Sequence, residues 1–204
     1  MHGILLDRDG VINRERADYV KSWDEFEFLP GVLAAIQRLA TLSIPIVVIT
    51  NQSVIGRGIV NRTAIDAIHQ RAQIEIAAAG GRIDAVFLCP HHPSARCDCR
   101  KPQPGLLYQA ADQFALNLAD TIFIGDSITD YQAAETAGCQ SILVRSGRQG
   151  EKLPTLIAQE QQSARLIGRP ASQPPLVADL SAAVELILEQ RVSHDIAPVA
   201  AKLD

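Results

Sequence analysis

Short apolar runs alternate with longer segments of helical periodicity along most of this chain. Ile4–Leu6 and Ile44–Ile49 are aliphatic runs followed by a polar residue, as buried parallel strands often are. Between them, Gly31–Thr41 spaces its apolar residues three and four apart, which predicts an amphipathic helix. The pattern repeats, with further helices predicted over Thr63–Ala79, Gly105–Phe114 and Tyr131–Ala137 and further strands over Ala85–Leu88, Thr121–Ile124 and Ser141–Val144. This alternation predicts an α/β fold with a doubly wound, Rossmann-like parallel sheet.

The C-terminal quarter of the chain is less regular. Residues 148–175 are rich in Gln, Ser, Arg, Gly and Pro, which favours a surface excursion from the domain. A last strand at Leu176–Ala178 and a closing helix at Ser181–Gln190 are expected to complete the fold. We therefore predict a single domain over residues 1–191 and a C-terminal tail over residues 192–204.

Charge and aromatic content argue against two classes of partner. The 204 residues carry a formal net charge of −4 and only 4% aromatic residues, so the composition lacks the basic excess and the stacking side chains of nucleic-acid-binding proteins. No apolar run approaches the ~20 residues that a membrane-spanning helix needs. The N-terminal residues lack the basic and apolar regions of a secretion signal, so we expect a cytoplasmic protein with no nucleic-acid or membrane partner.

Polar residues that could carry chemistry come at the ends of the predicted strands. They are Asp7, Thr50, Cys89 and Asp126, and the carboxyl ends of parallel strands form the ligand-binding edge of such a sheet. Asp9 lies two residues after Asp7 and projects to the same side of an extended chain, so the two carboxylates face one point. Like charges this close require a divalent cation or a shared proton, and hard oxygen ligands favour Mg²⁺.

Charge balance at this edge indicates a phosphate ligand. Asp130, one helical turn beyond Asp126, adds a further carboxylate to the set. Mg²⁺, Lys101 and Arg100 would balance the aspartates and leave a pocket that accepts an anion only in the presence of those cations.

Four segments of the chain together resemble one known family. An Asp-x-Asp-Gly motif at Asp7, a Thr-Asn pair at Thr50, a lysine before proline at Lys101 and a Gly-Asp-x-x-x-Asp motif around Asp126 follow one another. A single aspartate after a strand is commonly only a helix cap, but the four segments in this order resemble the haloacid dehalogenase superfamily of aspartate-nucleophile phosphotransferases. The resemblance covers residues 3–147 and resumes weakly near the C-terminal helix.

The resemblance implies how the aspartates would act. Asp7 would be the nucleophile that forms an aspartyl phosphate, and Asp9 the general acid that protonates the leaving oxygen and then activates water. The carboxylates of Asp7 and Asp126 and the backbone carbonyl of Asp9 would hold Mg²⁺, with Asp130 in a supporting position outside the ligand set.

The remaining matches imply how the phosphoryl group would be held. The hydroxyl of Thr50 and the backbone N–H of Asn51 would donate hydrogen bonds to the transferring phosphoryl oxygens. Lys101 would neutralise the charges of Asp7 and the phosphate together. Residues 1–191 would then form one catalytic domain.

Three cysteines and two histidines fall in a short segment, Cys89-Pro-His91-His92-Pro-Ser-Ala-Arg-Cys97-Asp-Cys99. In a cytosolic chain, such spacing favours a metal site over a disulfide. Cys89, His91, Cys97 and Cys99 predict a closed tetrahedral Cys₃His zinc site in a loop over residues 89–99, which would be structural because it leaves no open position. His92 in place of His91, or redox-active thiols, are the alternatives.

The predicted zinc loop runs directly into Cys99-Arg100-Lys101-Pro102. This combination resembles the heptose bisphosphate and histidinol phosphate phosphatases of the superfamily. The motifs at Leu6–Asn13, Thr50–Ser53 and Ile55–Gly58 are most similar to the D-glycero-D-manno-heptose-1,7-bisphosphate 7-phosphatases, whereas the short gap of residues 92–96 is similar to the histidinol phosphatases. A heptose bisphosphate phosphatase is therefore expected, and a histidinol-phosphate phosphatase is the alternative enzyme. The alternative from another class of protein is a phospho-acceptor or zinc-loop binding module without turnover.

No spacer between the motifs is long enough for a separate cap domain, so we expect a capless, open site for a small phosphorylated sugar. The candidate substrate-binding residues on its loops are Glu15, Asp18, Tyr19, Asn51, Gln52, Ser53, Arg57 and Arg100. The guanidinium of Arg100 is expected to bind a second phosphate, whose geometry it matches. The protein is expected to be a monomer.

Overall fold

The computed structural model describes residues 1–168 and 171–196 and confirms the predicted parallel sheet. Its six strands are hydrogen-bonded in the order β3-β2-β1-β4-β5-β6. They are β1 (Gly3–Leu6), β2 (Ile46–Asn51), β3 (Ala85–Cys89), β4 (Thr121–Gly125), β5 (Gln140–Val144) and β6 (Leu176–Val177). The α-helices are α1 (Val32–Ala40), α2 (Ser53–Gly56), α3 (Arg62–Ala78), α4 (Gly105–Phe114), α5 (Ile128–Ala137), α6 (Leu153–Leu166) and α7 (Leu180–Ile196).

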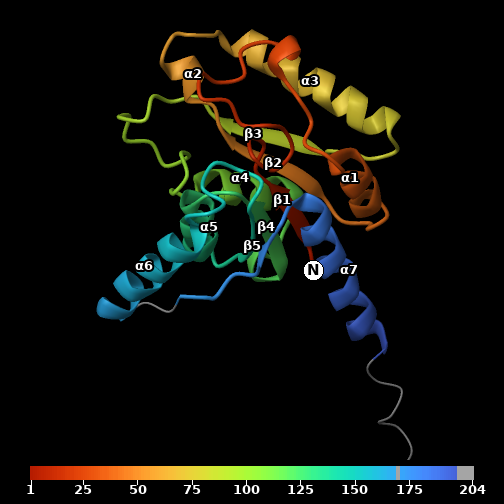
Figure 1. Cartoon of the computed structure of the whole chain (residues 1–204), viewed down its shortest axis with the longest axis vertical. Coiled ribbons are helices and arrows are strands. Elements are labelled where there is room, and N and C mark those ends of the chain that lie inside the picture. The colour runs from red at the N-terminus through yellow and green to blue at the C-terminus, as the bar shows by residue number, and fades with distance from the viewer. Residues whose placement is uncertain (169–170, 197–204) are drawn as a thin grey trace, which may run out of the picture.

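Helices cover both faces of the sheet (Figure 1). Successive strand residues point to opposite faces, so Ile4 and Leu6 of β1 pack into the core under α1, α3 and α7, whereas Leu5 packs under α4 and α5. β1 lies between β2 and β4, in the middle of the sheet, and both of its faces are buried. The switch in strand order beside β1 places the ligand-binding edge at the carboxyl end of this strand.

The segment predicted as a surface excursion contains a helix that the sequence reading missed. Over residues 148–175, α6 runs from Leu153 to Leu166 and buries Leu153, Ile157 and Ala164. Pro154 lies in its first turn, where a proline costs no helical hydrogen bond. The helical periodicity is weak because Gln159, Gln161, Gln162 and Ser163 leave only a narrow apolar stripe, which packs against β5 and α5.

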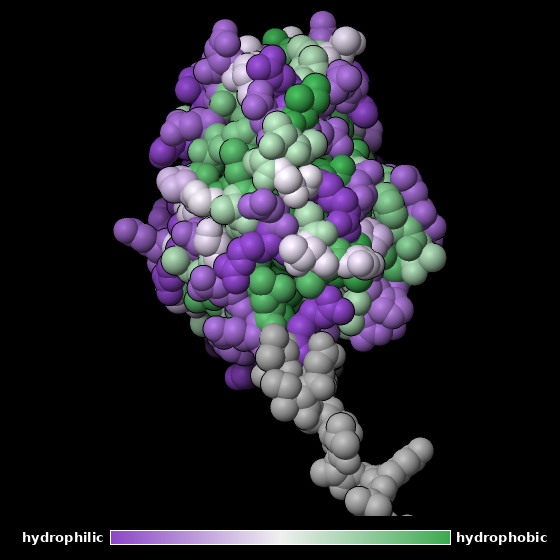
Figure 2. Space-filling view, turned by 90° about the vertical axis from the view of Figure 1, so that its right-hand side faces the viewer, coloured by the Kyte–Doolittle hydropathy of each residue, from purple (hydrophilic) through white to green (hydrophobic). Residues whose placement is uncertain are grey.

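The closing helix is also longer than predicted. α7 begins at Leu180 and extends to Ile196, beyond Gln190 and into the segment that was expected to be a tail. Residues 197–204 of that predicted tail lie outside the described residues. None of the described helices combines the length and apolar character needed to cross a bilayer. Hydrophilic residues are spread over the face of the molecule seen in Figure 2, as amphipathic helices that turn one side outward require.

Candidate active site

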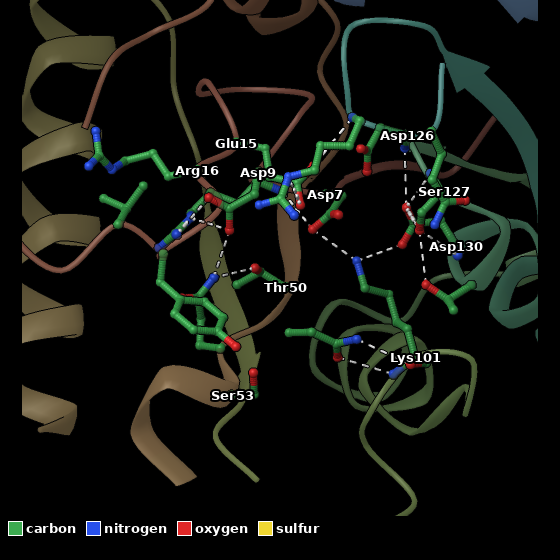
Figure 3. A pocket seen from close by; sticks show the side chains of 18 of the residues that line it. Asp7, Asp9, Glu15, Arg16, Thr50, Ser53, Lys101, Asp126, Ser127 and Asp130 are labelled. Atoms are coloured by element: carbon green, nitrogen blue, oxygen red, sulfur yellow. Dashed lines mark hydrogen bonds and ion pairs between the residues drawn. The ribbon is translucent and has the colours of Figure 1, made fainter. Parts of the chain in front are cut away.

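A polar cavity of about 610 Å³ opens at the carboxyl edge of the sheet. β1 and β4 end immediately before Asp7 and Asp126, and Thr50 lies near the end of β2, so all three side chains reach this edge (Figure 3). Lys101 enters from the loop before α4 and points toward Asp7 and Asp130. Four separate segments therefore bring Asp7, Thr50, Lys101 and Asp126 to the lining of a single cavity.

Lys101 connects two carboxylates inside the protein. Its Nζ lies 2.9 Å from Asp7 Oδ1 and 2.7 Å from Asp130 Oδ1, and it also donates a hydrogen bond to the backbone carbonyl of Ile49 at 2.9 Å. Burial acts to lower the pKa of Lys101, but the charges of Asp130 and Asp7 raise it above its ordinary value. The ammonium is thus held charged and in place although it is only 3% exposed.

Asp130 also accepts hydrogen bonds at the start of α5. Its Oδ2 accepts hydrogen bonds from the backbone N–H groups of Asp126 and Ser127, both at 3.1 Å, and from the Ser127 hydroxyl at 2.7 Å. Ser127 in turn caps the helix, so the two residues form a capping box. The turn that carries Asp126 is therefore tied to the side chain that anchors Lys101.

The carboxylates of Asp7, Asp126 and Asp130 form a buried group whose ligand oxygens lie within 4.8 Å of one another. Burial raises the pKa of Asp7 to about 7, against the opposing effect of Lys101, and burial together with the charges of Asp130 and Asp7 raises the pKa of Asp126 well above its ordinary value. Side chains at Gly10 and Gly147 would collide with the Asp126 carboxylate, so both positions need glycine. This donor set fits a hard divalent cation, which would keep the carboxylates ionised.

Asp9 faces a different set of partners. Its carboxylate accepts hydrogen bonds from Arg8, Asn13 (2.9 Å) and Gln52 (3.0 Å). Burial acts to raise the pKa of Asp9, but Arg8, with the hydrogen bonds of Asn13 and Gln52, holds it below its ordinary value. Gln52 also donates to Thr50 Oγ1 at 2.8 Å, which links Thr50 to Asp9 across the floor of the cavity (Figure 3).

Most of the predicted substrate-binding residues line the cavity, and one does not. The lining includes Glu15, Tyr19, Asn51, Gln52, Ser53, Arg57 and Arg100. Asp18 lies outside it and pairs instead with Lys21 (2.7 Å) and Arg16 (3.2 Å) on the surface. Within the cavity wall, Arg57 lies over the ring of Tyr19. Nη1 of Arg100 is buried and has no hydrogen-bond partner among the described residues.

Several residues that line the cavity were not predicted from the sequence. They are Arg8, Ser127, Thr129, Arg148, Gln149 and Lys152. Arg148 and Lys152 belong to the turn after β5. Residues that follow a parallel strand lie at the ligand-binding edge of the sheet, so both could have been predicted, but the whole segment was interpreted as a surface excursion. Arg148 Nε pairs with Glu15 Oε1 at 3.3 Å and so joins this turn to the loop after β1.

The predicted zinc ligands converge at the end of β3. Cys89 Sγ lies 3.5 Å from His91 Nδ1 and 3.7 Å from Cys97 Sγ, and His91 Nδ1 lies 3.2 Å from Cys99 Sγ. Thiolates bound to one zinc at ~2.3 Å in a tetrahedron would be ~3.8 Å apart, so the donor atoms fit a zinc ion. The structure brings His91 into the group and not His92, whose Nδ1 lies 2.7 Å from the Ser94 hydroxyl.

Comparisons with known proteins match this architecture. Residues 2–138 match the family model of the haloacid dehalogenase-like hydrolases. A D-glycero-beta-D-manno-heptose-1,7-bisphosphate 7-phosphatase from Pseudomonas aeruginosa is 37% identical over 92% of this chain and 97% of the relative. A D-glycero-alpha-D-manno-heptose-1,7-bisphosphate 7-phosphatase from Mycobacterium bovis is 40% identical over 72% of this chain and 81% of the relative.

A solved structure extends the match to three dimensions. The crystal structure of D,D-heptose 1,7-bisphosphate phosphatase from Bordetella bronchiseptica, complexed with magnesium and phosphate, superposes with a TM-score of 0.82 at 40% identity, covering 93% of this chain and 99% of that one. Because relatives this similar span nearly the whole chain, the protein belongs to the haloacid dehalogenase-like hydrolases and, among them, to the branch of the D,D-heptose-1,7-bisphosphate phosphatases.

Proposed function

We propose that this protein is a Mg²⁺-dependent phosphatase that removes the 7-phosphate of D-glycero-D-manno-heptose 1,7-bisphosphate through an aspartyl-phosphate intermediate. The observation that carries the proposal is the buried Lys101, which bridges Asp7 and Asp130 beside a group of three carboxylates in a cavity large enough for a sugar bisphosphate. The substrates named for the relatives from P. aeruginosa and M. bovis support the choice of sugar.

Asp7 is the proposed nucleophile. Its Oδ1 accepts a hydrogen bond from the backbone N–H of Arg8 at 2.7 Å and pairs with Lys101, so the carboxylate has a defined orientation at the end of β1. A carboxylate oxygen of Asp7 forms the new bond to phosphorus while the bond to the sugar O7 breaks. Because the pKa of Asp9 is low in the free protein, Asp9 must take up a proton when the substrate binds, and it transfers this proton to the departing oxygen. Asp9 then takes a proton from the water that attacks phosphorus, and inorganic phosphate and the Asp7 carboxylate are released.

Asp7, Asp126 and the backbone carbonyl of Asp9 would hold Mg²⁺, with Asp130 at the margin of the set. Bound there, the ion would supply the positive charge that keeps Asp7 ionised and reduces its repulsion of the phosphoryl group. Thr50 Oγ1 and the N–H of Asn51 would donate to the phosphoryl oxygens, and Lys101 would balance their charge.

The second phosphate of the substrate needs a second cationic site. Arg100 lines the same cavity as Asp7 and is half-buried there. A guanidinium binds phosphate bidentately, so Arg100 is the proposed partner of the distal phosphate. Glu15, Tyr19, Gln52, Ser53 and Arg57 form the remaining wall that would contact the sugar.

The second proposed metal is a structural zinc ion. Cys89, His91, Cys97 and Cys99 present their donor atoms at spacings that a tetrahedral ion requires. Because Cys99 is followed directly by Arg100 and Lys101, an ion there would fix the loop that presents both cations to the substrate.

Phosphate release from synthetic heptose 1,7-bisphosphate tests the function. The purified chain is assayed with Mg²⁺ on the α and β anomers separately, and the product is identified by ³¹P NMR. The proposal expects loss of the 7-phosphate with the 1-phosphate intact; release no greater than that of an Asp7→Asn control, or loss of the 1-phosphate, would contradict it. The monomeric state, the cytoplasmic location and the single catalytic domain over residues 1–191 stay predictions.

A further inference from the structure

Arg8 uses all three of its guanidinium nitrogens inside the protein. Nη2 and Nε donate to the two carboxylate oxygens of Asp9, at 2.8 and 3.1 Å. The third, Nη1, lies 3.0 Å from Nε2 of His69. The Arg8 side chain is only 3% exposed, so this fork is shielded from solvent on nearly every side.

His69 is carried by α3, none of whose residues lines the active-site cavity. Asn61 caps the start of α3 by accepting a hydrogen bond from the N–H of Ala64 at 2.8 Å, and Ile65 and Ile76 anchor the helix in the core. The imidazole is buried and does not line the active-site cavity; it borders a small apolar cavity of about 20 Å³ beside Arg8. His69 therefore reaches the site only through another residue.

The hydrogen bond to Arg8 requires a neutral imidazole. An arginine has no acceptor, so Nε2 of His69 must accept from Nη1 and the ring proton must lie on Nδ1. Burial and the positive charge of Arg8 lower the pKa of His69 to about 3, which agrees with this assignment. By accepting from Nη1, the buried histidine engages the one guanidinium nitrogen of Arg8 that does not bind Asp9.

We propose that His69 is a positioning residue of the phosphatase, which holds Arg8 so that its other two nitrogens set the position of the Asp9 carboxyl group relative to the leaving oxygen. This inference rests on the proposed function, because Asp9 is the group that would protonate O7 of the sugar as the phosphorus–O7 bond breaks. Asn13 and Gln52 also bind Asp9, but Arg8 alone contacts both of its oxygens among the described residues.

Two substrates with different leaving groups can separate a role of His69 in positioning Asp9 from a purely structural role in the core. An alkoxide such as O7 of the sugar needs a proton as it departs, whereas 4-nitrophenolate departs without one. Asp9 also serves the later hydrolysis of the aspartyl phosphate, which both substrates share, so the comparison must use kcat/KM, which reports only the steps up to departure of the leaving group. A variant with a displaced Asp9 therefore loses kcat/KM on the sugar phosphate and keeps most of its kcat/KM on 4-nitrophenyl phosphate. A variant that is only less stable loses the two activities together.

The experiment compares kcat/KM for the two substrates in His69→Leu and His69→Gln. Leucine fills the space without an acceptor, whereas the amide oxygen of glutamine can accept from Arg8. Ile65→Ala is the matched control: it weakens the packing of the same helix at a residue that does not line the small cavity beside Arg8. Arg8→Lys, which keeps the charge and loses the fork, provides a second test if the leucine variant does not fold.

In His69→Leu, kcat/KM on heptose bisphosphate should fall at least ~10-fold and kcat/KM on 4-nitrophenyl phosphate no more than ~2-fold. His69→Gln should recover most of the loss, and Arg8→Lys should reproduce it. Equal losses on both substrates, equal behaviour of the leucine and glutamine variants, or the same selective loss in Ile65→Ala would overturn the inference and leave the proposed function standing. Absence of turnover by the wild type would overturn both.

Discussion

Asn51 and Lys101 are joined by two hydrogen bonds between the side-chain amide of the first and the backbone of the second. Asn51 Nδ2 donates to the carbonyl of Lys101, and the N–H of Lys101 donates to Asn51 Oδ1, both at 3.1 Å. The amide thus ties the end of β2 to the loop that carries the buried ammonium. Position 51 has a role in the site beyond its backbone N–H.

Asn51→Ala should lower kcat/KM by roughly 10-fold, because two hydrogen bonds of about 0.5–1.5 kcal/mol each no longer align Lys101. The backbone N–H proposed to bind the phosphoryl group is retained in this variant. Steady-state kinetics on heptose bisphosphate measure the effect, and wild-type kinetics in Asn51→Ala would show that the paired amide has no part in placing Lys101.

Asp7→Asn should abolish turnover and leave the fold intact, because the amide keeps the shape of the carboxylate but cannot attack phosphorus. Asp9→Asn should lower kcat by roughly 10²–10⁴-fold, the usual contribution of general acid–base catalysis. Phosphate release measures both, with circular dichroism as the control for folding. Near-normal activity in Asp7→Asn would assign the nucleophile to another residue.

One zinc ion per chain should be found in protein purified without chelator, bound by three thiolates and one imidazole. Cys97→Ser should release it and lower activity, because the loop that precedes Arg100 and Lys101 loses its constraint. Elemental analysis gives the stoichiometry and X-ray absorption gives the ligand set. His92→Ala is the matched control, since His92 bonds to Ser94 outside the group, and it should retain the metal. Zinc-free wild-type protein would exclude the site.

Substrate choice should depend on Arg100. We expect kcat/KM for heptose 1,7-bisphosphate to exceed that for histidinol phosphate by at least roughly 10²-fold, because histidinol phosphate brings a cationic amine to a cavity wall that carries a guanidinium. Arg100→Ala should narrow this gap, since a charge-assisted contact contributes about 1.5–3 kcal/mol. If the wild type has comparable kcat/KM values for the two substrates, the short zinc loop has a larger effect on substrate preference than the charge of Arg100.

Lowering the pH should reduce the free energy of unfolding, in part through His69. Its pKa is lowered to about 3 by burial and by the charges of Arg8 and Arg62, with Asp9 acting in the opposite direction. The unfolded chain takes up a proton near pH 6.5 and the folded chain does not, so the stabilising contribution is complete above that pH and is lost as the pH falls toward 3. The slope for one proton is about 1.4 kcal/mol per pH unit.

Urea unfolding of the wild type and of His69→Gln between pH 7 and pH 4.5 measures this contribution. The free energy of unfolding should decline less steeply with falling pH in the variant, which has no group to protonate at position 69. Parallel pH dependence in the two proteins would show that the folded state tolerates a charged His69.

Local sequence determined the strands, most of the helices and the edge at which the chemistry gathers. The aliphatic runs of β1, β2 and β4 can be buried only as central strands, and a parallel sheet brings the residues after them, Asp7, Thr50 and Asp126, to one edge without any further information. The cysteine and histidine spacing likewise determined a cluster at the end of β3.

Tertiary structure decided everything that depends on contacts between distant segments. α6 has too narrow an apolar stripe to be recognised before α5 and β5 cover it, and with it Arg148 and Lys152 went unnoticed. Asp18 belongs to the right loop, but its partners Lys21 and Arg16 hold it outside the cavity. The contact of His69 with Arg8 joins residues 61 positions apart, and no periodicity or spacing encodes such a pair, because it exists only when α3 packs on the sheet.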